Sequence, residues 1–416
     1  MSFASIHFVI FLSLFLFLIN IFRHNWKFIS IVFSLFFYSY WSLILCLLLI
    51  FSVLHTFVIG NFIYKNKNSK FYFILGIIIS LTVLLIFKYF NFFVSDLANI
   101  NLKNTIFANI ILPIGISFYT FQSISYLTDI YTKKTVPTDL KNLFIFIIFF
   151  PQLIAGPIVR ASKLIPQIER GIDINFNNLK KGLMLIIWGY FLKLCIANNL
   201  DAYVSSVYNF IGESNTPTLV ITALFYSFLI YADFCGYSLI AIGIMKILGF
   251  NIPANFLTPY FSKSLTEFWR RWHISLSKFL RDYLYIPIGG NKNGISKTIR
   301  NILIVMTVGG LWHGASLNFV LWGFLHGIIL SFERLIKVIN INLNNSIFGM
   351  FYTFILVTIL WIPFSISNFN DLKIFFNVFN INDILKLNQI IEKFQVIQNL
   401  FLITILVILD FIFSRK

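Results

Sequence analysis

Long apolar runs, interrupted by short groups of basic residues, make up most of this chain. Most runs extend for about 18 residues or more, the length that an α-helix needs to cross the hydrocarbon core of a bilayer. The pattern predicts an all-α membrane protein with roughly ten or eleven transmembrane helices. The candidate spans are residues 6–22, 28–64 as a hairpin of two helices, 71–93, 113–130, 183–198, 219–250, 301–330, 348–364 and 400–413.

One apolar segment is too short to cross the membrane. Residues 144–150 run directly into the sequence PQLIAGP at 151–157, and Arg160 and Lys163 follow. Irregular backbone at membrane depth is tolerated only where protein or a water-filled cavity covers it, so we expect a re-entrant segment here. The span at residues 113–130 contains Asp129 and is expected to pack against protein.

Composition supports the same class. Hydrophobic residues make up 58% of the chain and charged residues only 11%, which leaves no ordinary way to build a water-soluble surface. A transmembrane barrel would show segments of about ten residues with alternating polarity instead. Residues 1–416 contain no linker-like segment and no internal repeat, and we expect a single membrane-embedded domain.

The net charge of +17 is interpreted as a topology signal and not as a nucleic-acid site. The basic residues lie between apolar runs, where positive charge is retained in the cytoplasm. Arg23 and Lys27 follow the first run, so that run is expected to be an uncleaved span with its N-terminus outside. The three cysteines show no paired spacing, and we expect neither a disulfide nor a metal site.

Residues 264–285, SLTEFWRRWHISLSKFLRDYLY, show apolar positions at helical spacing and predict one amphipathic helix with a basic side. Two interpretations of Arg270 and Arg271 stay open. They anchor the helix at the lipid headgroups, or they receive a polyanion such as the phosphates of coenzyme A. His273 falls on the apolar side and is either a hydrogen-bonded core residue or a catalytic one.

His313 lies in the sequence TVGGLWHGAS, between glycines in an apolar span. Burial disfavours a charged imidazolium, so we expect the neutral form that a general base requires, although a structural role is the alternative. His326 follows 13 residues later. On one straight helix that spacing separates the two by about 20 Å, so His326 is interpreted as structural.

Asp233 lies mid-span in the sequence YADFCGYS. A buried carboxylate is costly unless it is paired, protonated or functional. Pairing with His313 and pairing with an arginine both stay open.

Together, four motifs resemble the membrane-bound O-acyltransferases, in the branch of the alginate and peptidoglycan O-acetylation membrane components. They are PQLIAGPIVR at 151–160, YADFCGYS at 231–238, TEFWRRWHISLSKFLRDYLYIPIGGNKNG at 266–294 and GGLWHGASLNFVLWGFLHG at 309–327. The resemblance implies that His313 is the catalytic histidine and that His273 is the second characteristic one. It also implies acetyl-CoA as the acyl donor, a tunnel through a thinned centre of the fold and no metal. We expect Asp233, Trp272, Trp312, Arg270 and Arg271 to support the site or line the tunnel.

The resemblance further implies a bacterial cytoplasmic (inner) membrane protein that passes acetyl to an extracytoplasmic polysaccharide through a periplasmic SGNH-type esterase-like partner. Leu239 stands where alginate-type members usually carry an acidic residue, and the C-terminus is shorter than in many of them, so the polymer stays open. D-alanyl transfer to an envelope polymer is an alternative, although the stretch IPIGGNKNG favours the acetyl branch. A transporter or flippase is the alternative from another class.

Overall fold

The computed structural model describes residues 1, 3–98, 111–153, 156–338, 347–366 and 368–414. Within these residues the regular secondary structure is helical and no strand forms, which confirms the all-α class. The helices group into two compact units that alternate along the chain. One unit contains Met1–Gly189 and Tyr237–Pro253, and the other contains Tyr190–Gly236 and Ala254–Lys416. The single domain expected from the sequence stays a prediction.

The first unit is built from the N-terminal helices. They are α1 (Ile6–Ile21), α2 (Trp26–Ser39), α3 (Leu43–Lys65), α4 (Ser69–Leu84), α5 (Ile116–Tyr131), α6 (Leu140–Ile148), α7 (Phe150–Leu153), α8 (Ala161–Arg170) and α9 (Phe176–Tyr190). The hairpin expected at residues 28–64 is confirmed as α2 and α3, which a three-residue turn separates. Ser42 begins α3 by accepting a hydrogen bond from the Leu45 amide, as N-cap serines do.

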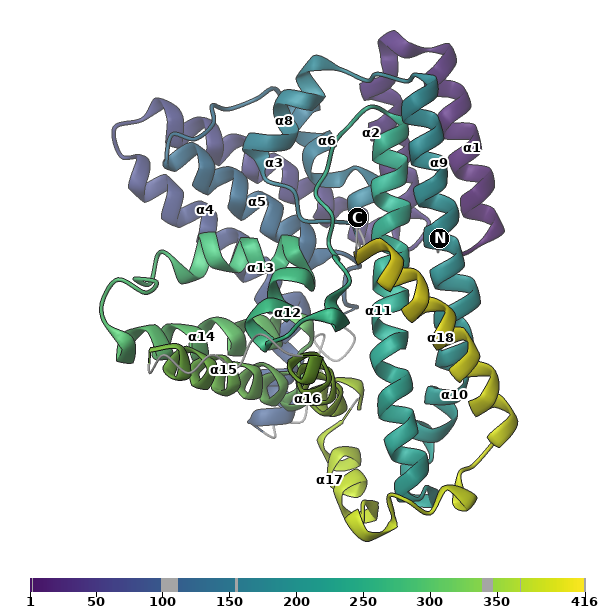
Figure 1. The fold of residues 1–416 in the computed structure, drawn as a ribbon. Helices are drawn as coiled ribbons and strands as arrows, with labels where there is room; N and C mark the ends of the chain where they lie inside the picture. The colour runs from purple at the N-terminus through teal and green to yellow at the C-terminus, as the bar shows by residue number, and fades with distance from the viewer. Residues whose placement is uncertain (2, 99–110, 154–155, 339–346, 367, 415–416) are drawn as a thin grey trace. The chain divides into compact units, whose positions relative to one another are not determined.

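Helices α3, α4 and α5 pack side by side (Figure 1). Twelve of the 16 residues of α5 are buried, Asp129 among them, so this helix packs against protein as expected. The segment expected to be too short to cross forms α6, of nine residues, and α7, of four. Residues 145–153 of that segment are buried, whereas Ile154 and Ala155 of the PQLIAGP sequence lie outside the described residues.

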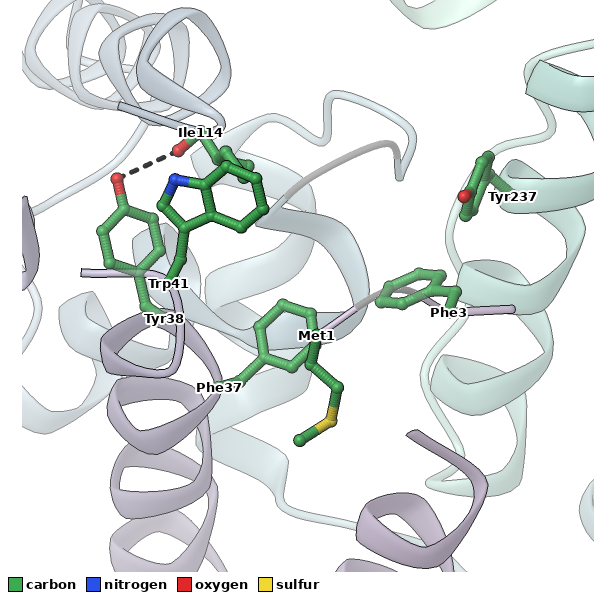
Figure 2. A pocket seen from close by; sticks show the side chains of 7 residues that line it. All are labelled: Met1, Phe3, Phe37, Tyr38, Trp41, Ile114 and Tyr237. Carbon is green, nitrogen blue, oxygen red and sulfur yellow. Dashed lines mark hydrogen bonds between the residues drawn. The ribbon is translucent and has the colours of Figure 1, made fainter. Parts of the chain in front are cut away.

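A cavity of about 200 Å³ lies in the first unit (Figure 2). The Tyr38 hydroxyl donates to the Ile114 carbonyl at its edge, 3.0 Å away. None of the candidate site residues lines it. Its lining consists of Met1, Phe3, Phe37, Tyr38, Trp41, Ile114 and Tyr237.

The second unit contains the remaining helices. A π-helical segment, Phe191–Ala197, leads from α9 into this unit. Its helices are α10 (Asn198–Asn209), most of α11 (Thr216–Ile247), α12 (Leu265–Arg271), α13 (Ile274–Leu280), α14 (Ile295–His313), α15 (Leu317–Val338), α16 (Ile347–Ser365), α17 (Phe369–Val378) and α18 (Lys393–Ser414).

Helices α14 and α15 form a tightly packed antiparallel hairpin (Figure 1). Gly310 faces Gly323, and a Cβ atom at Gly310 would lie 3.0 Å from the Gly323 Cα. Glycines at such a contact let two helix backbones approach closely. The continuous span predicted at residues 301–330 is therefore wrong, because the chain reverses after His313.

Seven helices of the described residues are long and apolar enough to cross a membrane, or eight if α1 and α2, bent by 115°, form one span. The sequence predicted more crossings. Part of the difference is that α1 and α5 have only 16 residues each, fewer than the roughly 18 that a helix needs to cross the bilayer.

Candidate active site

His313 is the last residue of α14. Beyond it, Gly314 has an extended backbone, and the chain re-enters a helix at Leu317. The His313 side chain is half-buried. Its ring lies 4.9, 5.2 and 5.1 Å, centroid to centroid, from the rings of Trp312, Trp322 and Phe364. The histidine thus stands in an aromatic enclosure at the turn of the hairpin.

His273 lies at a break between two short helices. α12 ends at Arg271, α13 begins at Ile274, and His273 itself has a left-handed backbone with φ +40° and ψ 54°. The single helix predicted for residues 264–285 is therefore wrong, because its apolar periodicity continues through the break and does not reveal it. A π-helical segment, Arg281–Tyr285, follows α13.

Asn255 holds this break in place. Its carbonyl accepts a hydrogen bond from the Ile274 amide at 2.9 Å, and its side-chain Oδ1 accepts one from the Ser275 hydroxyl at 2.6 Å. On the other side of the break, the Leu257 amide donates to the Arg271 carbonyl at 3.0 Å. These bonds anchor both helix ends to one irregular segment, which stabilises the left-handed conformation between them.

The His273 ring is almost fully buried, with 1% of the residue exposed. It lies edge-on to Phe234 at 4.6 Å and reaches Trp312 at 5.9 Å and His313 at 6.5 Å, all between ring centroids. Burial, and then the proximity of His313, lower the pKa of His273 well below its usual value. Neither ring nitrogen has a hydrogen-bond partner among the described residues.

The two candidate tryptophans have different surroundings. Trp312 contacts both histidine rings. Trp272 is also buried, but it packs into an aromatic cluster with Phe268 and Trp361, at ring distances of 5.4 and 5.0 Å. Of the two, Trp312 is the one that the structure brings into contact with His313.

His326 is close to the site, which contradicts the distance expected from a straight helix. It lies on α15, and Trp322 contacts both histidines, with ring distances of 5.2 Å to His313 and 4.7 Å to His326. The Trp269 indole N–H donates to His326 Nδ1 at 3.3 Å. The estimate of about 20 Å fails because the two histidines lie on opposite arms of the hairpin.

Asp233 forms an ion pair with Lys193, a partner that the sequence analysis did not consider. Both side chains are partly buried, with 35% and 18% exposed respectively. Lys193 lies in the π-helical segment Phe191–Ala197, and π-helical turns occur frequently at functional sites. The residue after Asp233, Phe234, packs on His273.

Arg270 is exposed, whereas Arg271 is bound to Glu267 of the same helix at 2.6 Å. A side chain of α15 binds the first backbone amides of α12. Glu333 accepts hydrogen bonds from the Leu265 and Thr266 amides at 2.6 and 2.9 Å. A carboxylate at this end of a helix satisfies unpaired amides and complements the helix dipole.

A family model for membrane-bound O-acyltransferases matches residues 30–368, most of the chain. The chain belongs to the membrane-bound O-acyltransferase family. With this membership and its seven or more apolar helices, it is a multi-pass membrane protein.

Three relatives indicate the branch of the O-acyltransferase family. The chain is 38% identical to a probable alginate O-acetylase of Pseudomonas aeruginosa, over 80% of this chain and 65% of the relative. It is 34% identical to a peptidoglycan O-acetyltransferase of Helicobacter pylori, over 84% of this chain and 73% of the relative. Identity to a teichoic acid D-alanyltransferase of Bacillus subtilis is 28%, over 69% of this chain and 74% of the relative. The chain thus spans less than two thirds of the first alginate relative's length.

Four residues around the site of this O-acyltransferase-family chain were not among the candidates that the sequence indicated: Lys193, Asn255, Trp322 and Glu333. Trp322 and Glu333 follow the LWHG sequence, and a reversal of the chain at Gly314 would have placed both on a helix that runs back along α14. For Asn255, which lies in an irregular segment, no pattern in the sequence gives a signal.

Proposed function

We propose that this protein is an O-acetyltransferase that moves an acetyl group from cytoplasmic acetyl-CoA to an extracytoplasmic polysaccharide. The observation that carries the proposal is the pair of histidines whose rings lie 6.5 Å apart in an aromatic enclosure. The relatives named as alginate and peptidoglycan O-acetyltransferases support acetyl transfer to such a polymer. The bacterial cytoplasmic (inner) membrane is the proposed location.

His313 is the proposed general base. A hydroxyl oxygen of the acceptor attacks the thioester carbonyl carbon while His313 takes the hydroxyl proton, and the same proton then goes to the leaving thiolate. Positioned proton transfer of this kind contributes about 10² to 10⁴ in rate. His273, kept neutral by burial, offers one N–H donor and one acceptor nitrogen to the substrate beside His313.

The basic side of α12 is the proposed binding surface for the donor's phosphates. Exposed Arg270 is available to a polyanion, whereas Arg271 would have to exchange its bond to Glu267 for one to phosphate. Lys278, exposed on α13, adds a second positive charge nearby in the sequence.

A periplasmic SGNH-type esterase-like partner is proposed as the carrier that delivers acetyl to the polymer. The donor is cytoplasmic and the acceptor is outside, so a group must cross the membrane between them. On the side predicted to be external, α10 and α11 are joined only by residues 210–215, too short a segment to grip a polymer.

Transfer of a D-alanyl group is the second candidate, supported by 28% identity to a teichoic acid D-alanyltransferase. Higher identity to the acetyl-transferring relatives favours the first. Transport without chemistry is the alternative from another class.

The test uses the full chain purified into lipid nanodiscs and supplied with radiolabelled acetyl-CoA. We expect release of coenzyme A above background, polymer acetylation only with the partner present, and loss of both in His313→Ala. His24→Ala, which removes an exposed histidine, is the matched control. Unchanged turnover in His313→Ala would end the assignment of the base, and transport of intact substrate without thioester cleavage would favour the transporter.

A further inference from the structure

Several buried hydrogen-bond donors around His313 lack acceptors in the part of the chain that the structure describes, and two of them lie on one face of α15. One is the indole N–H of Trp322, a residue with 1% exposure. The other is on His326, which has 0% exposure. Buried polar groups are nearly always hydrogen-bonded, so two unmet donors in one small region need an explanation.

The proton on His326 can be assigned from its neighbour. The Trp269 indole N–H is a donor only, and it points at His326 Nδ1 at 3.3 Å. Nδ1 must therefore carry the lone pair, and the neutral ring carries its proton on Nε2. Nε2 is the nitrogen without a partner among the described residues. His326 thus presents a fixed N–H with nothing of this chain to receive it.

Both donors belong to the immediate surroundings of the base. The Trp322 ring lies 5.2 Å from the His313 ring at an interplanar angle of 88°, and 4.7 Å from the His326 ring. Trp322 and His326 are four residues apart on α15, so they project from the same face of that helix. Trp269 packs on both rings, and Trp361 and Phe364 pack on the Trp322 ring.

We propose that the Trp322 and His326 N–H groups form the oxyanion hole that binds the carbonyl oxygen of the acyl donor. The inference rests on the proposed acyl transfer. When the acceptor hydroxyl attacks, the carbonyl π electrons move to the oxygen, and its negative charge is held by these two donors. The C–S bond then breaks, the carbonyl reforms, and the thiolate takes the proton from His313.

Neutral donors fixed by packing suit this role. They need no reorganisation as charge develops, and they lie in a site shielded from water, where each hydrogen bond to an oxyanion is strengthened. A histidine that is held in one tautomer by a second side chain acts here as an electrophile and not as a base. This assigns chemistry to a residue that the sequence favoured as structural.

The experiment compares four variants by steady-state kinetics of acetyl-CoA turnover in nanodiscs. Trp322→Phe removes one N–H and keeps an aromatic ring. His326→Asn keeps an acceptor for Trp269 but has no donor at the Nε2 position, whereas His326→Gln keeps a donor there. Trp26→Phe makes the same ring change at a buried tryptophan of the first unit, which has no described ring contact with His313, Trp322 or His326.

We expect kcat to fall about 10²-fold to 10³-fold in Trp322→Phe and in His326→Asn, with KM for acetyl-CoA changed about twofold or less. His326→Gln should retain at least about tenfold more activity than His326→Asn, and Trp26→Phe should stay near wild type. Equal losses in Trp322→Phe and Trp26→Phe, or in His326→Asn and His326→Gln, would overturn the oxyanion hole while the acyltransferase proposal stands. A wild-type protein that does not turn over acetyl-CoA or another thioester overturns both.

Discussion

Gly310 and Gly323 meet backbone to backbone where α14 packs against α15, close to the turn that carries His313. A Cβ at Gly310 would fall 3.0 Å from both the Cα and the amide nitrogen of Gly323 and still closer to the Phe319 carbonyl oxygen. These neighbours are backbone atoms, so a side chain cannot be accommodated by rotation. The position of His313 relative to α15 therefore requires glycine at both 310 and 323, because neither position has room for a side chain.

Gly310→Ala should destabilise the protein by about 1–3 kcal/mol, the usual cost of overpacking a close contact. It should also reduce turnover, because the added methyl group forces α14 and α15 apart close to His313 and displaces that side chain. Thermal unfolding of the purified variant and its acetyl-CoA turnover provide the two measurements.

Gly309→Ala is the matched control one residue away. The nearest atom to its added Cβ is Leu280 Cδ1 at 3.2 Å, the end of a flexible side chain. Alanine also favours a helix over glycine by about 1 kcal/mol, so this variant should be neutral or slightly stabilised. If the two variants behave alike, the close contact does not determine the hairpin.

Glu333→Gln should destabilise the protein by about 1–2 kcal/mol, because the carboxylate that caps α12 loses its charge and one acceptor oxygen. It should also raise KM for acetyl-CoA if α12 binds the donor's phosphates. Chemical unfolding and steady-state kinetics test both. The same exchange at exposed Glu213, Glu213→Gln, should change neither quantity. An unchanged KM with lowered stability would separate the cap from donor binding.

The Lys193–Asp233 ion pair should show strong coupling in a double-mutant cycle. Removing one partner leaves a partly buried charge unpaired, so Lys193→Ala and Asp233→Ala should each lower stability. The double variant should lose less than the sum, with a coupling energy of about 1–3 kcal/mol. Additive losses would mean that solvent or lipid headgroups satisfy each charge separately.

The sequence predicted the all-α membrane class better than the geometry of the candidate site. Apolar length and basic clusters placed most helices correctly, because those features act locally. Periodicity failed at His273 and at His313, since the break and the turn are set by backbone bonds to Asn255 and by the approach of Gly310 to Gly323. Both are contacts between distant residues, and a pattern along one helix carries no information about them. For the same reason, the sequence did not indicate that Lys193 pairs with Asp233 or that His326 lies close to the site.

His273→Asn should be more stable than His273→Ala by about 1 kcal/mol. The backbone there is left-handed, with φ +40°, and asparagine tolerates that region better than alanine does. Both variants should lose most of their acetyl-CoA turnover, since neither has an imidazole. Equal stability of the two would show that the break relaxes when the ring is removed, and full activity in His273→Asn would exclude the imidazole from the reaction.

His273 should also make folding depend on pH. Burial lowers the pKa of His273 in the folded protein. Below the ordinary histidine pKa of about 6.5, the unfolded chain therefore binds a proton at this residue, whereas the folded protein does not. Stability contributed by the neutral ring is therefore complete above about pH 6.5 and falls with decreasing pH, by at most about 1.4 kcal/mol per unit, until the lowered pKa is reached. Wild type should lose more stability than His273→Asn between pH 7 and pH 5.5.

The comparison with His273→Asn isolates this one group, because every other titrating residue is common to both proteins. Unfolding of each protein is followed in the same detergent at both pH values, which gives the free energy of unfolding lost between pH 7 and pH 5.5. The quantity of interest is the loss in wild type minus the loss in His273→Asn. It should be positive and at most about 2 kcal/mol over that interval. A difference of zero would mean that His273 gains a proton as readily when folded as when unfolded. That result contradicts a neutral, buried imidazole beside His313 and with it the donor and acceptor roles proposed for His273.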